Sequence, residues 1–142
     1  ALLSLAQLDH VSHSDVFQVI QASEHYSRVN KNDVFTNVAL IYYESNFVQD
    51  TVSSANACGL MQVSDAFSRF SCDELVSSVD INLSEGNRMI SEFERMFPKE
   101  DWICHYNAGS VCNSTSIRWS NAVIHFTKRL KKAYFKEIEL CL

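Results

Sequence analysis

One glutamate, Glu44, follows a run of residues, 34–43, that is almost entirely apolar. A helix that is apolar on every side is a buried helix, so this stretch predicts a buried helix with a carboxylate at its C-terminal end. The negative end of the helix dipole and the apolar surroundings both disfavour a charged carboxylate, which predicts a raised pKa for Glu44. A carboxylic acid that keeps its proton near neutral pH is suited to act as a general acid on a glycosidic oxygen.

A polar segment comes directly after this glutamate and is predicted to be a loop long enough to have a function of its own. Ser53 in this loop and Gln62 after it carry groups that hydrogen-bond to sugar hydroxyls and acetamides, and Met61 is suited to pack against a sugar face. Each also has a structural alternative that stays open: a loop cap for Ser53, a helix-surface amide for Gln62 and a core side chain for Met61.

A second group of polar residues lies at the end of the short apolar segment 102–106. Tyr106 offers both a ring and a hydroxyl, and Asn107 either binds sugar or shapes the turn before Gly109. A core position for Tyr106 is the structural alternative. The two groups are about sixty residues apart in the chain, so only the fold can bring them together.

These residues resemble the soluble-lytic type of lytic transglycosylases, lysozyme-like enzymes that cut bacterial peptidoglycan. The resemblance is carried by four ordered pieces: Glu44-Ser45 with Phe47; Ser53, Ala57 and Gly59-Leu60-Met61-Gln62-Val63; Asn82-Leu83 with Gly86; and Tyr106-Asn107-Ala108-Gly109. Four pieces at compatible spacing make a far more specific signal than any one of them.

The resemblance implies an all-α, lysozyme-like single domain over residues 1–142, with a substrate cleft over Glu44. The motif-bearing core covers about residues 23–109, and a C-terminal helix covers about 117–140. The implied reaction cleaves the bond between N-acetylmuramic acid and N-acetylglucosamine and forms 1,6-anhydro-muramic acid, with Glu44 as general acid and then base. The implied substrate-binding residues are Ser53, Met61, Gln62, Tyr106 and Asn107.

The sequence departs from the family pattern at three places. Asn56 stands where a glycine is usual, Ser64-Asp65 replaces a residue-proline pair, and His105 replaces a common alanine. These departures leave Glu44 intact and bear on the shape of the loop, and so on the finer substrate preference.

Two alternatives to transglycosylation remain open. A muramidase that uses water usually needs a second carboxylate, and Asp50 and Asp65 are the only acids between Glu44 and Cys72. The other alternative is an inactive cell-wall-binding or structural module with the same fold.

The composition is that of a globular helical protein. The chain has 142 residues, 46% of them hydrophobic, with only 3 glycines and 1 proline, which favours one domain of mostly helices. No apolar run is long enough to span a bilayer. Residues 1–6 are a short apolar stretch without a basic start, which favours an ordinary helix over the remnant of a removed signal segment.

The charge of the chain is uneven. Residues 117–142 carry six basic and two acidic side chains, while the whole chain has a net charge of −5. The basic cluster, Lys128 to Lys136, is either the solvated face of the last helix or a patch that attracts an anionic polymer. The acidic remainder argues against nucleic acid as a partner. The resemblance implies peptidoglycan glycan strands as the partner, outside the cytoplasm (periplasmic or secreted) or aboard a phage particle or an envelope-spanning secretion machine.

Five cysteines favour an oxidising compartment, with Cys58–Cys72 and Cys104–Cys112 as the sequence-local pairs, although five buried free thiols remain the alternative. No cofactor-binding motif is present. His10 and His13 are the only histidines near ligand spacing, and no metal site is expected from them.

The pattern of apolar residues and helix breakers also predicts the remaining elements. Helices are expected over residues 12–26, 33–44, 60–70, 73–79, 80–97, 102–106 and 117–140.

Overall fold

The computed structural model describes residues 13–99 and 101–141, and this part of the chain is mostly helical. The predicted helix at residues 1–6 and the histidine pair that includes His10 lie outside the described residues. The helices are α2 (His13–Asn30), α3 (Val34–Ser45), α4 (Cys72–Ser77), α5 (Val79–Met96), α6 (Asp101–Ala108) and α7 (Ser114–Cys141). Two short antiparallel strands, β1 (Ala57–Cys58) and β2 (Val63–Ser64), pair Ala57 with Ser64 and Cys58 with Val63.

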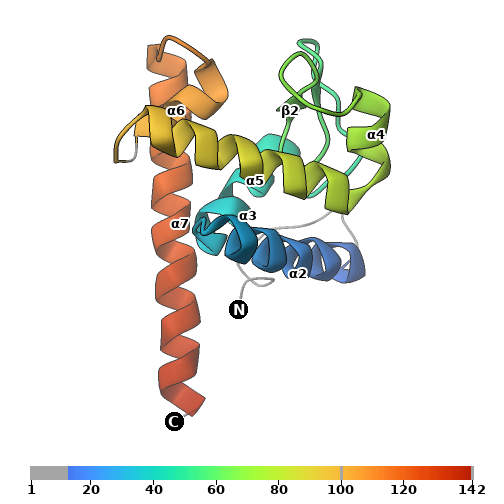
Figure 1. Ribbon diagram of the computed structural model, residues 1–142. Coiled ribbons are helices and arrows are strands. Elements are labelled where there is room, and N and C mark those ends of the chain that lie inside the picture. Colours follow the sequence, from blue (N-terminus) through green and yellow to red (C-terminus); the bar gives the residue numbers. More distant parts are fainter. Residues whose placement is uncertain (1–12, 100, 142) are drawn as a thin grey trace.

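Helix α3 lies at the centre of the fold, with the other long helices around it (Figure 1). Helix α3 packs against α2 and against α7. Helix α5 packs on α2 and on α6, and α6 in turn packs on α7. The strands and α4 lie at the far end of α5 from α6 (Figure 1). The site of interest is therefore built where α3 ends against the strand region.

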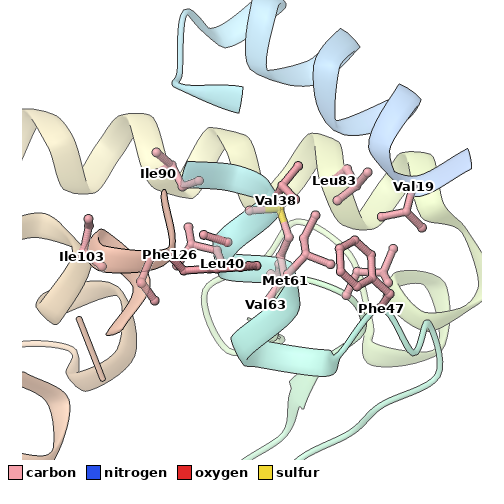
Figure 2. Close-up of a cluster of buried hydrophobic side chains, with 14 of the residues drawn as sticks. Val19, Val38, Leu40, Phe47, Met61, Val63, Leu83, Ile90, Ile103 and Phe126 are labelled. Carbon is pink, nitrogen blue, oxygen red and sulfur yellow. The ribbon is translucent and has the colours of Figure 1, made fainter. Parts of the chain in front are cut away.

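The hydrophobic core surrounds α3 and extends into the strand region. Figure 2 shows Val38 and Leu40 from α3 beside Met61 and Val63 from the strand region, with Leu83 of α5 close by. All five side chains are 3% exposed or less. The prediction of a buried central helix is confirmed, but the burial is not all round, because Tyr43 is 40% exposed.

Several helix starts have side-chain caps that explain where they begin. The Ser71 hydroxyl accepts from the backbone N–H of Glu74, whose carboxylate in turn accepts from the Ser71 backbone N–H, a reciprocal capping box for α4. Ser78 caps α5, so this helix begins at Val79, one residue before the expected start at residue 80. Asn113 caps α7 by accepting from the backbone N–H groups of residues 115 and 116, so this helix begins three residues earlier than expected.

The prediction of a helix over residues 60–70 is wrong. This segment contains β2 and a series of turns, because Gly59 and Gln62 have φ angles of +76° and +48°, which no right-handed helix accommodates. The apolar residues Leu60, Met61 and Val63 are fully buried although they lie on an irregular segment. Their apolar pattern therefore reflected burial and not helical periodicity.

Two disulfides join Cys58 to Cys72 and Cys104 to Cys112. The sequence-local pairing is therefore confirmed, and the alternative of free thiols is wrong for these four residues. The first bridge ties β1 to the start of α4, and the second closes the segment between α6 and α7. No described helix is long and apolar enough to cross a membrane.

Candidate active site

Glu44 lies in the last turn of α3, where the helix gives way to the loop. Asn46 ends the helix in a left-handed conformation with φ +49°, and its backbone N–H donates to the Tyr42 carbonyl at 3.0 Å. The neighbouring Ser45 hydroxyl bonds to the Leu60 carbonyl oxygen at 2.9 Å. The acid is thereby fixed at the end of a buried helix whose terminus is joined to the loop of residues 59–61.

The Glu44 carboxyl is partly buried, and burial raises its pKa to about 7. Among the described residues, no side chain hydrogen-bonds to this carboxyl and no cation pairs with it. Of the two causes expected from the sequence, desolvation by the surroundings accounts for the raised pKa, and the helix dipole is not among its causes. Near neutral pH, a large fraction of Glu44 is protonated and able to donate a proton.

Asn82 of α5 holds the loop beside Glu44. Its Oδ1 accepts from the Met61 backbone N–H at 2.9 Å, and its Nδ2 donates to the carbonyls of Cys58 at 2.8 Å and Leu75 at 3.2 Å. The side chain is fully buried, so these bonds satisfy backbone groups that water cannot reach. The side-chain amide of Asn82 thus forms hydrogen bonds with backbone groups that would bond to one another if this segment were a helix.

Two glycines let the backbone and side chains approach closely around this loop. A Cβ on Gly59 would lie 2.2 Å from Asn82 Nδ2, and one on Gly86 would lie 2.4 Å from Met61 Sδ. Both distances are far below van der Waals contact. Gly59 also needs its positive φ, whereas Gly86 needs only the space on α5.

Tyr106 reaches the same loop from α6. Its hydroxyl donates to the Met61 carbonyl oxygen at 2.8 Å, across 45 residues of sequence. Burial raises the pKa of Tyr106 well above its ordinary value, and the charge of Glu44 raises it further. Tyr106 therefore keeps its proton and lies close enough to Glu44 for the two groups to interact electrostatically.

The two polar loop residues are bound within the loop itself. The Ser53 hydroxyl accepts from the backbone N–H groups of Ala55 at 3.3 Å and Ala57 at 3.1 Å, as the loop-cap alternative expected. Gln62 donates through Nε2 to the carbonyls of Thr51 and Gly59, each at 3.0 Å. Among the described residues, no partner bonds to the Gln62 side-chain oxygen, which leaves that acceptor available.

The last two predicted residues occupy contrasting places. The Met61 side chain is 0% exposed and packs against Gly86, so in this structure it serves the core, and Figure 2 shows it among the core side chains. Asn107 is exposed near the end of α6, and its side chain forms no hydrogen bond with another described residue. The fold therefore brings Glu44, Gln62 and Tyr106 to one loop, while Met61 contributes there through its backbone.

The interpretation of the sequence missed an ion cluster beside this loop, centred on a buried glutamate. Glu85 of α5 is 0% exposed and accepts from the Arg69 backbone N–H at 3.0 Å and its guanidinium at 2.7 Å. Arg88 also donates to Glu85 at 2.7 Å and to the Phe67 carbonyl at 3.3 Å. A glutamate between Leu83 and Gly86 on the apolar side of α5 was the signal that could have revealed it.

Nothing in the described part of the chain suggests a metal centre: no group of three or more histidine, cysteine, aspartate or glutamate side chains there could hold a metal ion.

Replacing Tyr106 with phenylalanine tests its role in holding the loop. The change leaves the Met61 carbonyl without its donor, so we expect the free energy of unfolding to fall by about 1–2 kcal/mol. Urea unfolding followed by circular dichroism measures this loss. The matched control is Tyr43→Phe, which removes an exposed hydroxyl and should leave stability unchanged. Equal stability of wild type and Tyr106→Phe would show that the bond does not anchor the loop.

The described part of the chain is mostly helical with a small two-stranded sheet, which agrees with a lysozyme-like fold. The family model described as the transglycosylase SLT domain matches residues 19–125. The chain belongs to this family, which acts on peptidoglycan. No curated protein matches the chain.

Proposed function

We propose that this protein is a peptidoglycan lytic transglycosylase, with Glu44 as its single acid–base group. The observation that carries the proposal is the environment of Glu44: a partly buried carboxyl whose pKa lies near 7 because of desolvation alone. The ideal pKa of a group that first gives and then takes a proton lies near the working pH. Membership of the transglycosylase SLT family supports the choice of substrate.

In the first step, protonated Glu44 donates its proton to the oxygen that links N-acetylmuramic acid to N-acetylglucosamine. The bond between this oxygen and the anomeric carbon breaks, and the N-acetylglucosamine side leaves as an alcohol. The carbonyl oxygen of the muramic acid's own N-acetyl group attacks the anomeric carbon and carries the developing positive charge. No enzyme nucleophile is needed for this step.

In the second step, the Glu44 carboxylate removes the proton from the 6-hydroxyl of the same muramic acid. The oxygen attacks the anomeric carbon, displaces the N-acetyl oxygen and closes the 1,6-anhydro ring. Glu44 ends protonated, ready for the next cycle, and no water is consumed. Because the attacking hydroxyl is tethered to the reacting ring, its effective concentration is high.

Among the described residues, the raised pKa of Glu44 comes from burial, with no contribution from a second carboxylate, and this supports transglycosylation over hydrolysis. A glycosidase that uses water usually places two carboxyls within about 10 Å of each other, whether it inverts or retains the configuration at the anomeric carbon. Asp50, the nearer of the two candidate acids in sequence, is exposed on the loop.

Product analysis of digested cell wall tests the proposal. Purified sacculi are incubated with the protein, and the released fragments are identified by mass spectrometry. Anhydro-muramic ends, lighter than reducing ends by one water, are expected. Reducing ends would instead identify a hydrolytic muramidase, and wall binding without any released fragment would identify an inactive binding module.

The pKa of Glu44 predicts how activity depends on pH. The free enzyme must carry a protonated Glu44 to begin the reaction, so kcat/KM should be level below pH 7 and fall above it. Each pH unit beyond the pKa should reduce the rate about tenfold. Turbidity loss of a sacculus suspension between pH 5 and pH 9 measures the profile, roughly spanning the range over which such a group titrates. A profile flat through pH 8 would contradict the assignment.

The proposed substrate places the protein's action outside the cytoplasm, where peptidoglycan lies. A phage particle and an envelope-spanning secretion machine are two settings in which such a local cut through the wall is needed. Fractionation of the cells or particles that contain the protein distinguishes these settings from a freely secreted enzyme.

A further inference from the structure

A cavity lies away from Glu44, where α3 begins. It has a volume of about 220 Å³, is open to solvent on one side, and is lined by the first turn of α3, the last turns of α5, the start of α6 and the middle of α7. Thr36, on its wall, is eight residues from Glu44 along α3, a separation of about 12 Å in a helix. This cavity is therefore distinct from the candidate active site.

The walls of this cavity combine an apolar surface with balanced charge. Trp102 and Ile124 supply the apolar surface, and Trp102 is only 6% exposed. Two carboxylates and two ammonium groups line the same space, so the charges of its wall sum to zero: Asp33, Glu94, Lys128 and Lys131. A ligand with a net charge would disturb this balance, whereas a ligand with one charge of each sign would preserve it.

Only half of these charges are paired with each other. Lys131 donates to Asp33 at 2.8 Å, and Thr36 donates to the same carboxylate at 2.7 Å. Glu94 and Lys128 line the cavity but are exposed to solvent, and neither forms an ion pair with a described residue. One anion and one cation are thus left available to a ligand, over an apolar surface.

The electrostatics at Glu94 favour an incoming cation. Burial raises the pKa of Glu94, and the nearby carboxylate of Asp33 raises it further. An ammonium group placed beside Glu94 would relieve this repulsion between like charges. A carboxylate on the same ligand would then be free to bond with Lys128.

We propose that this cavity binds the zwitterionic end of a wall peptide: an ammonium and a carboxylate on one carbon, attached to a short aliphatic chain. Glu94 takes the ammonium, Lys128 takes the carboxylate, and Trp102 and Ile124 cover the chain. The volume is below the roughly 300–1,000 Å³ of pockets for drug-sized ligands, which fits a single amino-acid end and not a disaccharide. The choice of a wall peptide rests on the proposed function, since the peptide is part of the same polymer.

Calorimetric titration tests the site with four probes on the Glu44→Gln chain, which separates binding from cleavage. Norleucine has the zwitterion and the aliphatic chain, hexanoate lacks the ammonium, and pentylamine lacks the carboxylate. The fourth probe is a disaccharide tripeptide whose diaminopimelate end is free. We expect norleucine and the tripeptide to bind, with the tripeptide tighter, and the other two to bind at least about tenfold more weakly.

Three variants complete the test. Glu94→Gln and Lys128→Gln should each weaken binding about tenfold or more, since each removes one charged partner. Lys132→Gln, an exposed change on the same helix outside the cavity, should leave binding unaltered. Equal binding of all probes, or full binding by Glu94→Gln, would overturn the proposal. Binding of norleucine but not of the tripeptide would overturn the wall peptide as the ligand, whatever the cleavage assay shows.

Discussion

Glu44→Gln is expected to abolish release of wall fragments while leaving the fold intact. Glutamine has nearly the same shape but carries no transferable proton, so both the donation and the later abstraction are lost. Removing a general acid–base group typically costs about 10²–10⁴-fold in rate, and one group that serves both steps should lie at the upper end. Soluble fragments from sacculi, quantified by chromatography, measure the loss.

The controls for this variant also separate the two possible reactions. Asp50→Asn and Asp65→Asn remove the other acids of the loop region, and transglycosylation predicts that both retain activity. If either variant lost activity, and if the wild-type protein released fragments with reducing ends, a second catalytic carboxylate would be indicated. Full activity of Glu44→Gln would remove Glu44 from the mechanism.

The same variant should gain stability at alkaline pH. The folded-state pKa of Glu44, about 7, lies above the ordinary 4.5, so the folded protein loses stability as pH rises from about 4.5 to about 7. Glutamine removes this penalty. Because Glu44 is only partly buried, we expect a gain of about 1–3 kcal/mol at pH 8 and none below pH 4. A gain in stability together with a loss of activity would show that burying Glu44 lowers the stability of the folded protein while serving the reaction.

Glu85→Gln is expected to produce the largest loss of stability among the variants considered. Glu85 is fully buried and is the shared partner of Arg69 and Arg88, so its loss leaves both guanidinium groups without that partner. Breaking a buried ion pair in this way costs about 3–5 kcal/mol. Because Arg69 is largely exposed and remains hydrated, we expect about 3 kcal/mol, measured by urea unfolding at pH 7.

The acid dependence of stability gives a second measurement of the same cluster. Burial would raise the pKa of Glu85, but hydrogen bonds from Arg88 and Arg69 outweigh it and lower the pKa to about 2. The stabilisation is therefore complete above about pH 4.5 and is lost as pH falls towards 2. Glu85→Gln should lack this part of the acid dependence.

Glu92→Gln is the matched control for the cluster. Glu92 also pairs with Arg88, but its side chain is 44% exposed, so the change should cost less than about 1 kcal/mol. Similar losses for Glu85→Gln and Glu92→Gln would show that burial of the cluster contributes little.

The sequence predicted the elements whose signals are local. The apolar run before Glu44 was long enough to predict α3, and the expected end of α5 at residue 97 was within one residue of the observed end at Met96. The raised pKa of Glu44 followed from the same local reasoning. The two disulfides were also predictable as sequence-local pairs, although spacing alone did not decide between them and free thiols.

The parts that were missed depend on contacts between distant residues. The segment after Gly59 looked helical because its apolar residues are buried, but its backbone bonds to the side chain of Asn82, 21 residues beyond Met61. The ion pair between Arg69 and Glu85 likewise spans 16 residues. No periodicity or propensity encodes such partners, so the shape of the loop beside the acid could not be derived from the sequence alone.

The bond from Tyr106 to Met61 means that the acid's surroundings are completed late in the order of the chain. A ribosome that has released only the first half of this protein has already made Glu44, but not the tyrosine that anchors the neighbouring loop. The loop beside Glu44 therefore lacks this anchor until α6 has been synthesised. We accordingly expect the proposed activity to require a chain that extends through α6.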